Sequence, residues 1–121
     1  MKIAVTTSSD KELEAKVDSR FGRAPYFTVV DIEDMKVEVI NNSAGNAASG
    51  AGVSAAQKMS EEGIDGVISG NFGPKAFETL KNGDLKLYSF SGTVKEAVDE
   101  LKKGNLEELS NPTNAPHSGL N

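Results

Sequence analysis

The sequence has no cysteine and a single histidine, His117, among its 121 residues. The absence of cysteine excludes disulfides, thiolate nucleophiles, and zinc or iron–sulfur sites held by cysteine. One histidine without neighbours of its kind is not a metal ligand set, so we expect a structural or solvated role for it. Any metal must therefore be held in another way.

The sequence also lacks long apolar runs and an excess of positive charge. No segment approaches the roughly 18 apolar residues of a membrane span, and residues 1–10 are too short an apolar stretch for a signal peptide. Thirteen basic and eighteen acidic residues give a net charge of −5, which disfavours general nucleic-acid binding. We expect a cytoplasmic protein, monomeric or weakly self-associating, that binds neither membranes nor nucleic acids.

What remains is the composition of one ordinary globular domain, 37% hydrophobic and 26% charged. A domain of this length can bury about two thirds of its unfolded surface and needs no disulfide or metal to hold it together. Residues 105–121 are rich in Asn, Pro and Ser. This composition predicts a mostly flexible C-terminal tail after a single α/β domain over residues 1–104.

Side-chain patterns predict five strands and three helices in the order β-β-β-α-β-α-β-α. The expected strands cover residues 2–6, 26–32, 36–40, 67–69 and 85–88, with the third and the last at the two sheet edges. The expected helices cover residues 52–62, 74–82 and 94–103. The last helix is the best marked, because Thr93 and Glu96 form a capping box before it and Gly104 follows it.

Three glycine-bearing turns, at residues 41–52, 70–74 and 89–93, each precede one of these helices. Parallel strands joined by helices place such turns at the carboxyl end of the sheet, where open α/β folds bind ligands. Each helix N-terminus carries about half a positive charge and up to four free N–H groups. We expect the three turns to converge on one crevice that binds an anion. The loop after Thr7 would join them if the first strand is parallel to the fourth.

The candidate binding residues come from these turns and from the loop after the first strand. They are Ser8, Arg20, Arg23, Asn42, Gly50, Gly52, Asn71, Phe72, Gly73, Gly92 and Thr93.

Several candidates have a second interpretation. The two arginines, the only ones in the chain, could clamp an anion or form a solvated ion pair with Asp18. Asn42 could donate to a ligand or cap a turn, and Phe72 could cover a ligand or belong to the core. Glycines such as Gly70 could keep Cβ atoms away from the amides and allow positive φ, or serve turn geometry alone.

Known nucleotide-binding and catalytic motifs match only partly. Residues 45–50 copy the start of a phosphate loop, but Ala51 and Gly52 stand where its Lys and Ser/Thr are required. Residues 50–55 match a relaxed dinucleotide fingerprint without the acid that binds the ribose. With no cysteine, no catalytic histidine candidate and no acidic cluster at this end of the sheet, the sequence offers no acid–base pair, so we expect no enzymatic activity.

Four stretches of the chain resemble the dinitrogenase iron–molybdenum cofactor biosynthesis family, which includes NifX, NafY and the C-terminal domain of NifB. They are SRFGRAPYFTVVDIE (19–33), GAGVSAA (50–56), GVISGNFGPKAF (66–77) and SGTVKEAVDELKKGNLEEL (91–109). The resemblance implies a ribonuclease H-like α/β fold with a five-stranded mixed sheet and helices on both faces. It also implies a non-enzymatic carrier of an anionic metal–sulfur cluster or its molybdenum or iron precursor, with cofactor-assembly proteins as partners.

One residue departs from the family pattern. Members that handle the nitrogenase cofactor often carry histidine before the Phe-Gly of the first stretch, where this chain has Arg20. Imidazole can ligate iron or molybdenum, whereas guanidinium can only pair with negative charge. The chain is therefore more similar to small stand-alone members outside nitrogen fixation. An oxyanion such as molybdate also suits the crevice, and a phosphate-bearing metabolite or nucleotide is the alternative ligand.

Overall fold

Five strands form one mixed sheet in the order β3-β2-β1-β4-β5 in the computed structural model, which describes residues 1–42 and 50–112. The strands are β1 (Lys2–Thr7), β2 (Tyr26–Asp31), β3 (Lys36–Asn41), β4 (Gly66–Ser69) and β5 (Lys86–Ser89). Strand β2 is antiparallel to both of its neighbours, whereas β1, β4 and β5 run parallel. The predicted succession of strands and helices and the two predicted edge strands are confirmed.

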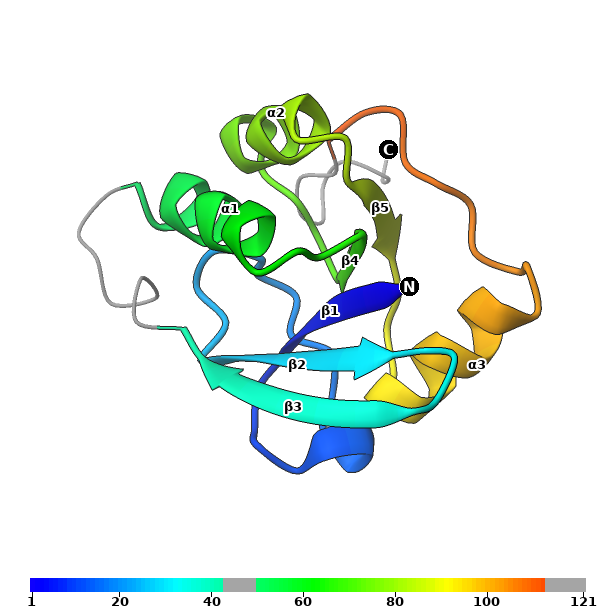
Figure 1. Ribbon diagram of the computed structural model, residues 1–121. Helices are drawn as coiled ribbons and strands as arrows, with labels where there is room; N and C mark the ends of the chain where they lie inside the picture. Colours follow the sequence, from blue (N-terminus) through cyan, green and yellow to red (C-terminus); the bar gives the residue numbers. More distant parts are fainter. Residues whose placement is uncertain (43–49, 113–121) are drawn as a thin grey trace.

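The helices cover both faces of the sheet (Figure 1). Helices α1 (Ala51–Glu61) and α2 (Pro74–Asn82) pack side by side on one face, and α3 (Val94–Lys102) lies on the other. A short 3-10 turn, η1 (Glu12–Glu14), which the sequence patterns did not predict, lies beside α3. None of the helices in the described ranges has the length and apolar character that crossing a bilayer requires.

The two faces of the sheet bury separate sets of apolar side chains. Strand β1 shows how alternation divides them, because Ala4 belongs to the cluster under α1 and α2 whereas Ile3 and Val5 belong to the cluster under α3. All three side chains are fully buried. Strand β1 is therefore buried on both of its faces.

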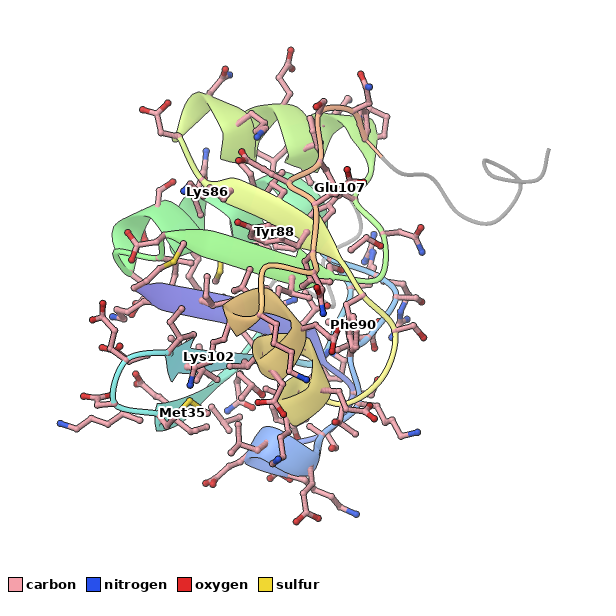
Figure 2. The ribbon with its side chains drawn as sticks, turned by 90° about the vertical axis from the view of Figure 1, so that its right-hand side faces the viewer. Met35, Lys86, Tyr88, Phe90, Lys102 and Glu107 are labelled. Carbon is pink, nitrogen blue, oxygen red and sulfur yellow. The ribbon has the colours of Figure 1, made fainter. Side chains whose placement is uncertain are left out.

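The segment after α3 packs along the sheet edge. The Leu109 N–H donates to Leu87 O on β5 at 2.7 Å, and Lys81 Nζ of α2 donates to Glu108 Oε2 at 2.7 Å. Figure 2 shows this segment, which carries Glu107, running beside Tyr88 of β5. The first part of the predicted flexible tail is thus anchored. Residues 113–121 lie outside the described residues, and the domain boundary at residue 104 stays a prediction.

Candidate functional site

A cavity of about 620 Å³ lies between the first turns of α1 and α2 and the loop of residues 19–23. Its walls come from three separate segments, residues 19–23, residues 50–53, and residues 71 and 73–76. Small-molecule sites commonly have volumes of about 300–1,000 Å³, so the cavity is large enough for a ligand of several heavy atoms. The last segment follows β4 directly, which places the cavity at the carboxyl end of the parallel strands.

Two close backbone contacts hold the loop of residues 19–23 against α1 and the turn after β4. A Cβ atom on Gly22 would lie 2.6 Å from both Cα and N of Gly52, and a Cβ atom on Gly70 would lie 2.6 Å from Cα of Ser19. Gly70 is not among the glycines with positive φ, so it is needed for this contact and not for a left-handed turn. Glycine at these two positions allows the loop to lie directly against α1 and the β4–α2 turn.

Helices α1 and α2 begin at the cavity without side-chain caps among the described residues. Their N-caps are Gly50 and Gly73, and neither first turn contains an acidic residue. The first N–H groups of an α-helix have no acceptor within the helix, and they form its positive end. Residues 51–53 of α1 and 75–76 of α2 line the cavity, so two helix N-termini meet there.

The charged side chains among the described lining residues are all positive, although the protein is acidic. Both arginines of the chain, Arg20 and Arg23, lie in the lining, and so does Lys75. The described lining residues include no Asp or Glu, although the chain has eighteen acidic residues. Lys75 was not predicted, but its place at the second position of a helix that opens on a candidate glycine turn was a signal that could have found it.

Arg20 pairs with Asp18 and also lines the cavity. The ion pair is therefore present, and a role in binding an anion stays a prediction. The carboxylate accepts from Arg20 Nε and Nη2, each at 3.1 Å, and from Arg20 N at 2.8 Å. Ser8 Oγ donates to Asp18 Oδ2 at 3.0 Å. The Asp18 side chain is only 6% exposed, whereas that of Arg20 is 59% exposed. In this pair the carboxylate is therefore buried, and the guanidinium is accessible to solvent.

The protonation of this pair is set by the same contacts. Burial would raise the pKa of Asp18, but hydrogen bonds from the Arg20 side chain, the Arg20 backbone and Ser8 outweigh it and hold the pKa below its ordinary value. The hydrogen bond to Asp18 raises the pKa of Arg20, which keeps the guanidinium charged. Both groups are thus ionised under physiological conditions.

The Asp18–Arg20 pair should make the free energy of unfolding depend on pH in the acidic range. Because the pKa of Asp18 is lower in the folded than in the unfolded state, its stabilisation is complete well above about pH 4 and is lost as pH falls through the folded-state pKa. We expect the denaturant midpoint to fall more steeply below about pH 4 in the wild type than in Asp18→Asn. Parallel curves would show that Asp18 titrates alike in both states.

Six of the predicted site residues line this cavity, and they are Arg20, Arg23, Gly50, Gly52, Asn71 and Gly73. Asn42 lies behind the loop instead, where its buried Nδ2 donates to Gly22 O at 3.0 Å and to Ala24 O at 2.8 Å. Phe72 is fully buried, with its ring centroid 5.6 Å from that of Phe21, so it belongs to the core beneath the cavity. Its predicted role as a ligand cover does not fit this placement.

The third predicted turn does not join the cavity. Gly92 and Thr93 are absent from its lining, and Thr93 Oγ1 instead accepts from Glu96 N at 3.2 Å while Glu96 Oε1 accepts from Thr93 N at 2.9 Å. The expectation that all three helix N-termini meet in one crevice is therefore wrong. The turns share one end of the sheet, but α3 crosses to the opposite face. Ser89 and Ser91 of the third turn line a neighbouring hollow, which shares Ser19 and Asn71 with the cavity.

Metal-ligating side chains do not gather in the part of the chain that the structure describes. Residues 1–42 and 50–112 contain no group of three or more Asp, Glu, His or Cys side chains placed to hold a metal ion. The residues of the phosphate-loop-like stretch up to position 49 lie outside the described residues. What the cavity offers is N–H donors and cationic side chains, which suit an anion.

Known proteins resemble this chain over nearly its whole length. The profile of the family described as "Dinitrogenase iron-molybdenum cofactor" matches residues 1–104. An uncharacterised protein of Methanocaldococcus jannaschii is 30% identical over 113 residues, which cover 90% of this chain and 92% of that protein.

Two solved structures share the fold at substantial sequence identity. The apo form of the orange protein from Desulfovibrio gigas is 34% identical with a TM-score of 0.89, covering 93% of this chain and 96% of that one. A Thermotoga protein of the DUF35 family, provisionally assigned as NifB, is 39% identical with a TM-score of 0.80, covering 95% of this chain and 98% of that one.

Proposed function

Because this chain belongs to the dinitrogenase iron–molybdenum cofactor family, we propose that it is a carrier that binds an anionic metal–sulfur cluster, or its molybdenum or iron precursor, in the cavity between α1 and α2. The cluster is cargo, and the protein is not an enzyme. The observation that carries the proposal is the composition of the lining. Three cationic side chains gather there with two helix N-termini for which the described residues provide no side-chain cap, and the described lining residues include no carboxylate.

The lining suits the chemistry of such a cargo. Sulfide-bearing clusters carry negative charge spread over several large, weakly hydrated atoms, which accept hydrogen bonds from N–H groups. The N–H groups of residues 51–53 and 75–76 and the three cations supply charge-assisted donors. Apolar lining residues, Val53 and Ala76 among them, suit an anion that gives up its water easily. Because the chain has no cysteine, no thiolate holds the cluster, which suits a cargo that is released to another protein.

The relatives support the same proposal. The orange protein was solved in an apo form, a description that implies another form with a bound group. The family name links its members to iron–molybdenum cofactor assembly, so we place the partners of this protein among cofactor-assembly proteins of the cytoplasm. The sheet order, with only β2 reversed, supports the finer proposal that the fold is of the ribonuclease H-like class.

The second candidate is a phosphate-bearing metabolite or a nucleotide in the same cavity. Helix N-termini that open on glycine are common phosphate sites, and Gly50 and Gly73 stand at such N-termini here. This candidate predicts a response to nucleotides that the cluster carrier would not give. The two are therefore separable in solution.

Anaerobic titration with tetrathiomolybdate, followed by its visible absorbance, tests the proposal. We expect a saturable spectral change at one equivalent per chain. In a thermal-shift series a ligand present at a hundred times its Kd adds about 2.7 kcal/mol to the free energy of unfolding, and we expect no such gain from nucleotides. A flat titration together with stabilisation by a nucleotide would replace the cluster carrier by the second candidate.

A further inference from the structure

Asp18 is unusual because it places a buried negative charge directly behind a cavity that we propose binds an anion. Its carboxylate lies 3.1 Å from Arg20 Nε and compensates the charge of that guanidinium at close range. Arg23 and Lys75 are the other two cationic side chains of the lining. If charge alone mattered, removing the carboxylate would improve the site.

The pairing geometry indicates what Asp18 contributes instead. A guanidinium group is planar and carries five N–H donors in a fixed fork. Asp18 engages the edge formed by Nε and Nη2 with two parallel hydrogen bonds, each 3.1 Å long. Two bonds on one edge fix the plane of the group. The edge that carries Nη1 is not engaged by this carboxylate, and Arg20 lies in the cavity lining.

Asp18 is itself held firmly by the central strands. Its N–H donates to Thr6 O of β1 at 2.7 Å, and its carbonyl accepts from Gly70 N at 3.1 Å, just beyond β4. The Thr6 hydroxyl donates to the same carbonyl at 2.9 Å. Ser8 Oγ fixes the second carboxylate oxygen at 3.0 Å. The carboxylate that holds the guanidinium is thus anchored to the central strands β1 and β4.

We infer that Arg20 serves the cavity as an oriented pair of hydrogen-bond donors and that Asp18 is the positioning residue that holds it in that orientation. The inference rests on the proposed function, since it concerns how the same cavity selects its anion. A guanidinium that is already oriented loses little conformational entropy when an anion binds. It therefore favours anions with two acceptor atoms whose spacing matches that of its N–H donors. Arg20 thus contributes selection among anions as well as positive charge.

Asp18→Asn separates orientation from charge because the two have opposite effects on affinity. Losing the fixed orientation of Arg20 should weaken anion binding, whereas losing the negative charge of Asp18 should strengthen it. The variant keeps the shape of the side chain and makes the cavity more positive by one charge. We expect tetrathiomolybdate to bind roughly tenfold more weakly than to the wild type, because the charge-assisted fork is no longer fixed. Glu12→Gln, which changes the net charge equally on the α3 side of the sheet, should leave the affinity unchanged. Equal or tighter binding by Asp18→Asn would overturn the inference.

Arg20→Lys tests the inference even if Asp18→Asn does not fold. It keeps the positive charge but has no planar fork, so we expect a similar loss of roughly tenfold, whereas a site that needs only charge would bind as before. An unchanged affinity in this variant would overturn the inference.

The orientation of Arg20 can also be measured without any anion. The chain has only two arginines, so nitrogen-15 NMR shows two Nε–H signals, and Arg20→Lys identifies one of them. We expect the Arg20 signal to exchange slowly with water in the wild type and quickly in Asp18→Asn. Equal exchange in the two proteins would overturn the positioning role. A failure of the proposed function looks different, because it appears as a wild-type protein that does not bind tetrathiomolybdate.

Discussion

Gly73→Asp is expected to abolish binding of tetrathiomolybdate while slightly stabilising the fold. Gly73 is the N-cap of α2, with φ −69° and ψ 164°, and a Cβ atom added there would meet nothing within 4 Å. An aspartate at this position can accept from the free N–H groups of the first turn and complement the helix dipole, a gain of about 0.3–1 kcal/mol. The same carboxylate occupies the donors and repels an anion, so we expect the affinity to fall roughly a hundredfold or more.

Thr93→Asp is the matched control for that experiment. It places the same charge at the N-cap of α3, on the opposite face of the sheet, where an aspartate can still cap the helix. We expect absorbance titration to give an affinity within about twofold of the wild type, because Thr93 does not line the cavity. Equal losses in the two variants would show that net charge, and not the donors of α2, controls binding.

Gly22→Ala is expected to lower the free energy of unfolding by about 3 kcal/mol or more. Its new Cβ atom would lie 2.6 Å from backbone atoms of Gly52, which cannot move aside as the end of a flexible side chain can. The loop that carries Arg20 and Arg23 would therefore be pushed away from α1. Urea unfolding followed by circular dichroism measures the change.

Gly73→Ala provides the comparison for Gly22→Ala, since that position has open space and an ordinary φ. We expect its free energy of unfolding to stay within about 1 kcal/mol of the wild type, the range of an N-cap change from Gly to Ala. A Gly22→Ala protein as stable as this control would show that the loop does not lie against α1.

The elements that were predictable from the sequence are those whose signals are local. The capping box of Thr93 and Glu96 and the proline at the start of α2 mark helix ends within a few residues, and both lie where expected. The alternating charges of β3 marked an edge strand for a similar reason, since one side of an edge strand faces water. Local chemistry thus fixed the order of elements.

The grouping of the site residues was less predictable, because it depends on the side of the sheet that each helix covers. The turns before α2 and α3 look alike in sequence, yet only the first opens on the cavity. The burial of Asp18 was not predictable either, because it arises from packing between β1 and β4 and not from its neighbours in sequence. An ion pair with Arg20 was one of two interpretations of the sequence, but the burial of Asp18 and the bidentate geometry were not predicted.

The stretches that resemble the family contain glycines whose role in backbone contacts could not be predicted from composition. Gly22 and Gly70 fall in two of these stretches, and both are required by contacts between backbones far apart in sequence. A pattern of turns alone treats such glycines as flexible joints. Here they are points of contact that bring the loop, α1 and the β4–α2 turn together to form the walls of the cavity.

Residue-by-residue NMR of the tetrathiomolybdate titration tests the central claim most directly. If the anion is held by the first turns of α1 and α2, the largest amide shifts should occur at Gly52, Val53, Lys75 and Ala76, with little change at Glu96 of the capped α3. Shifts that gather at Ser89 and Ser91 instead, or a spectrum that does not change, would contradict it.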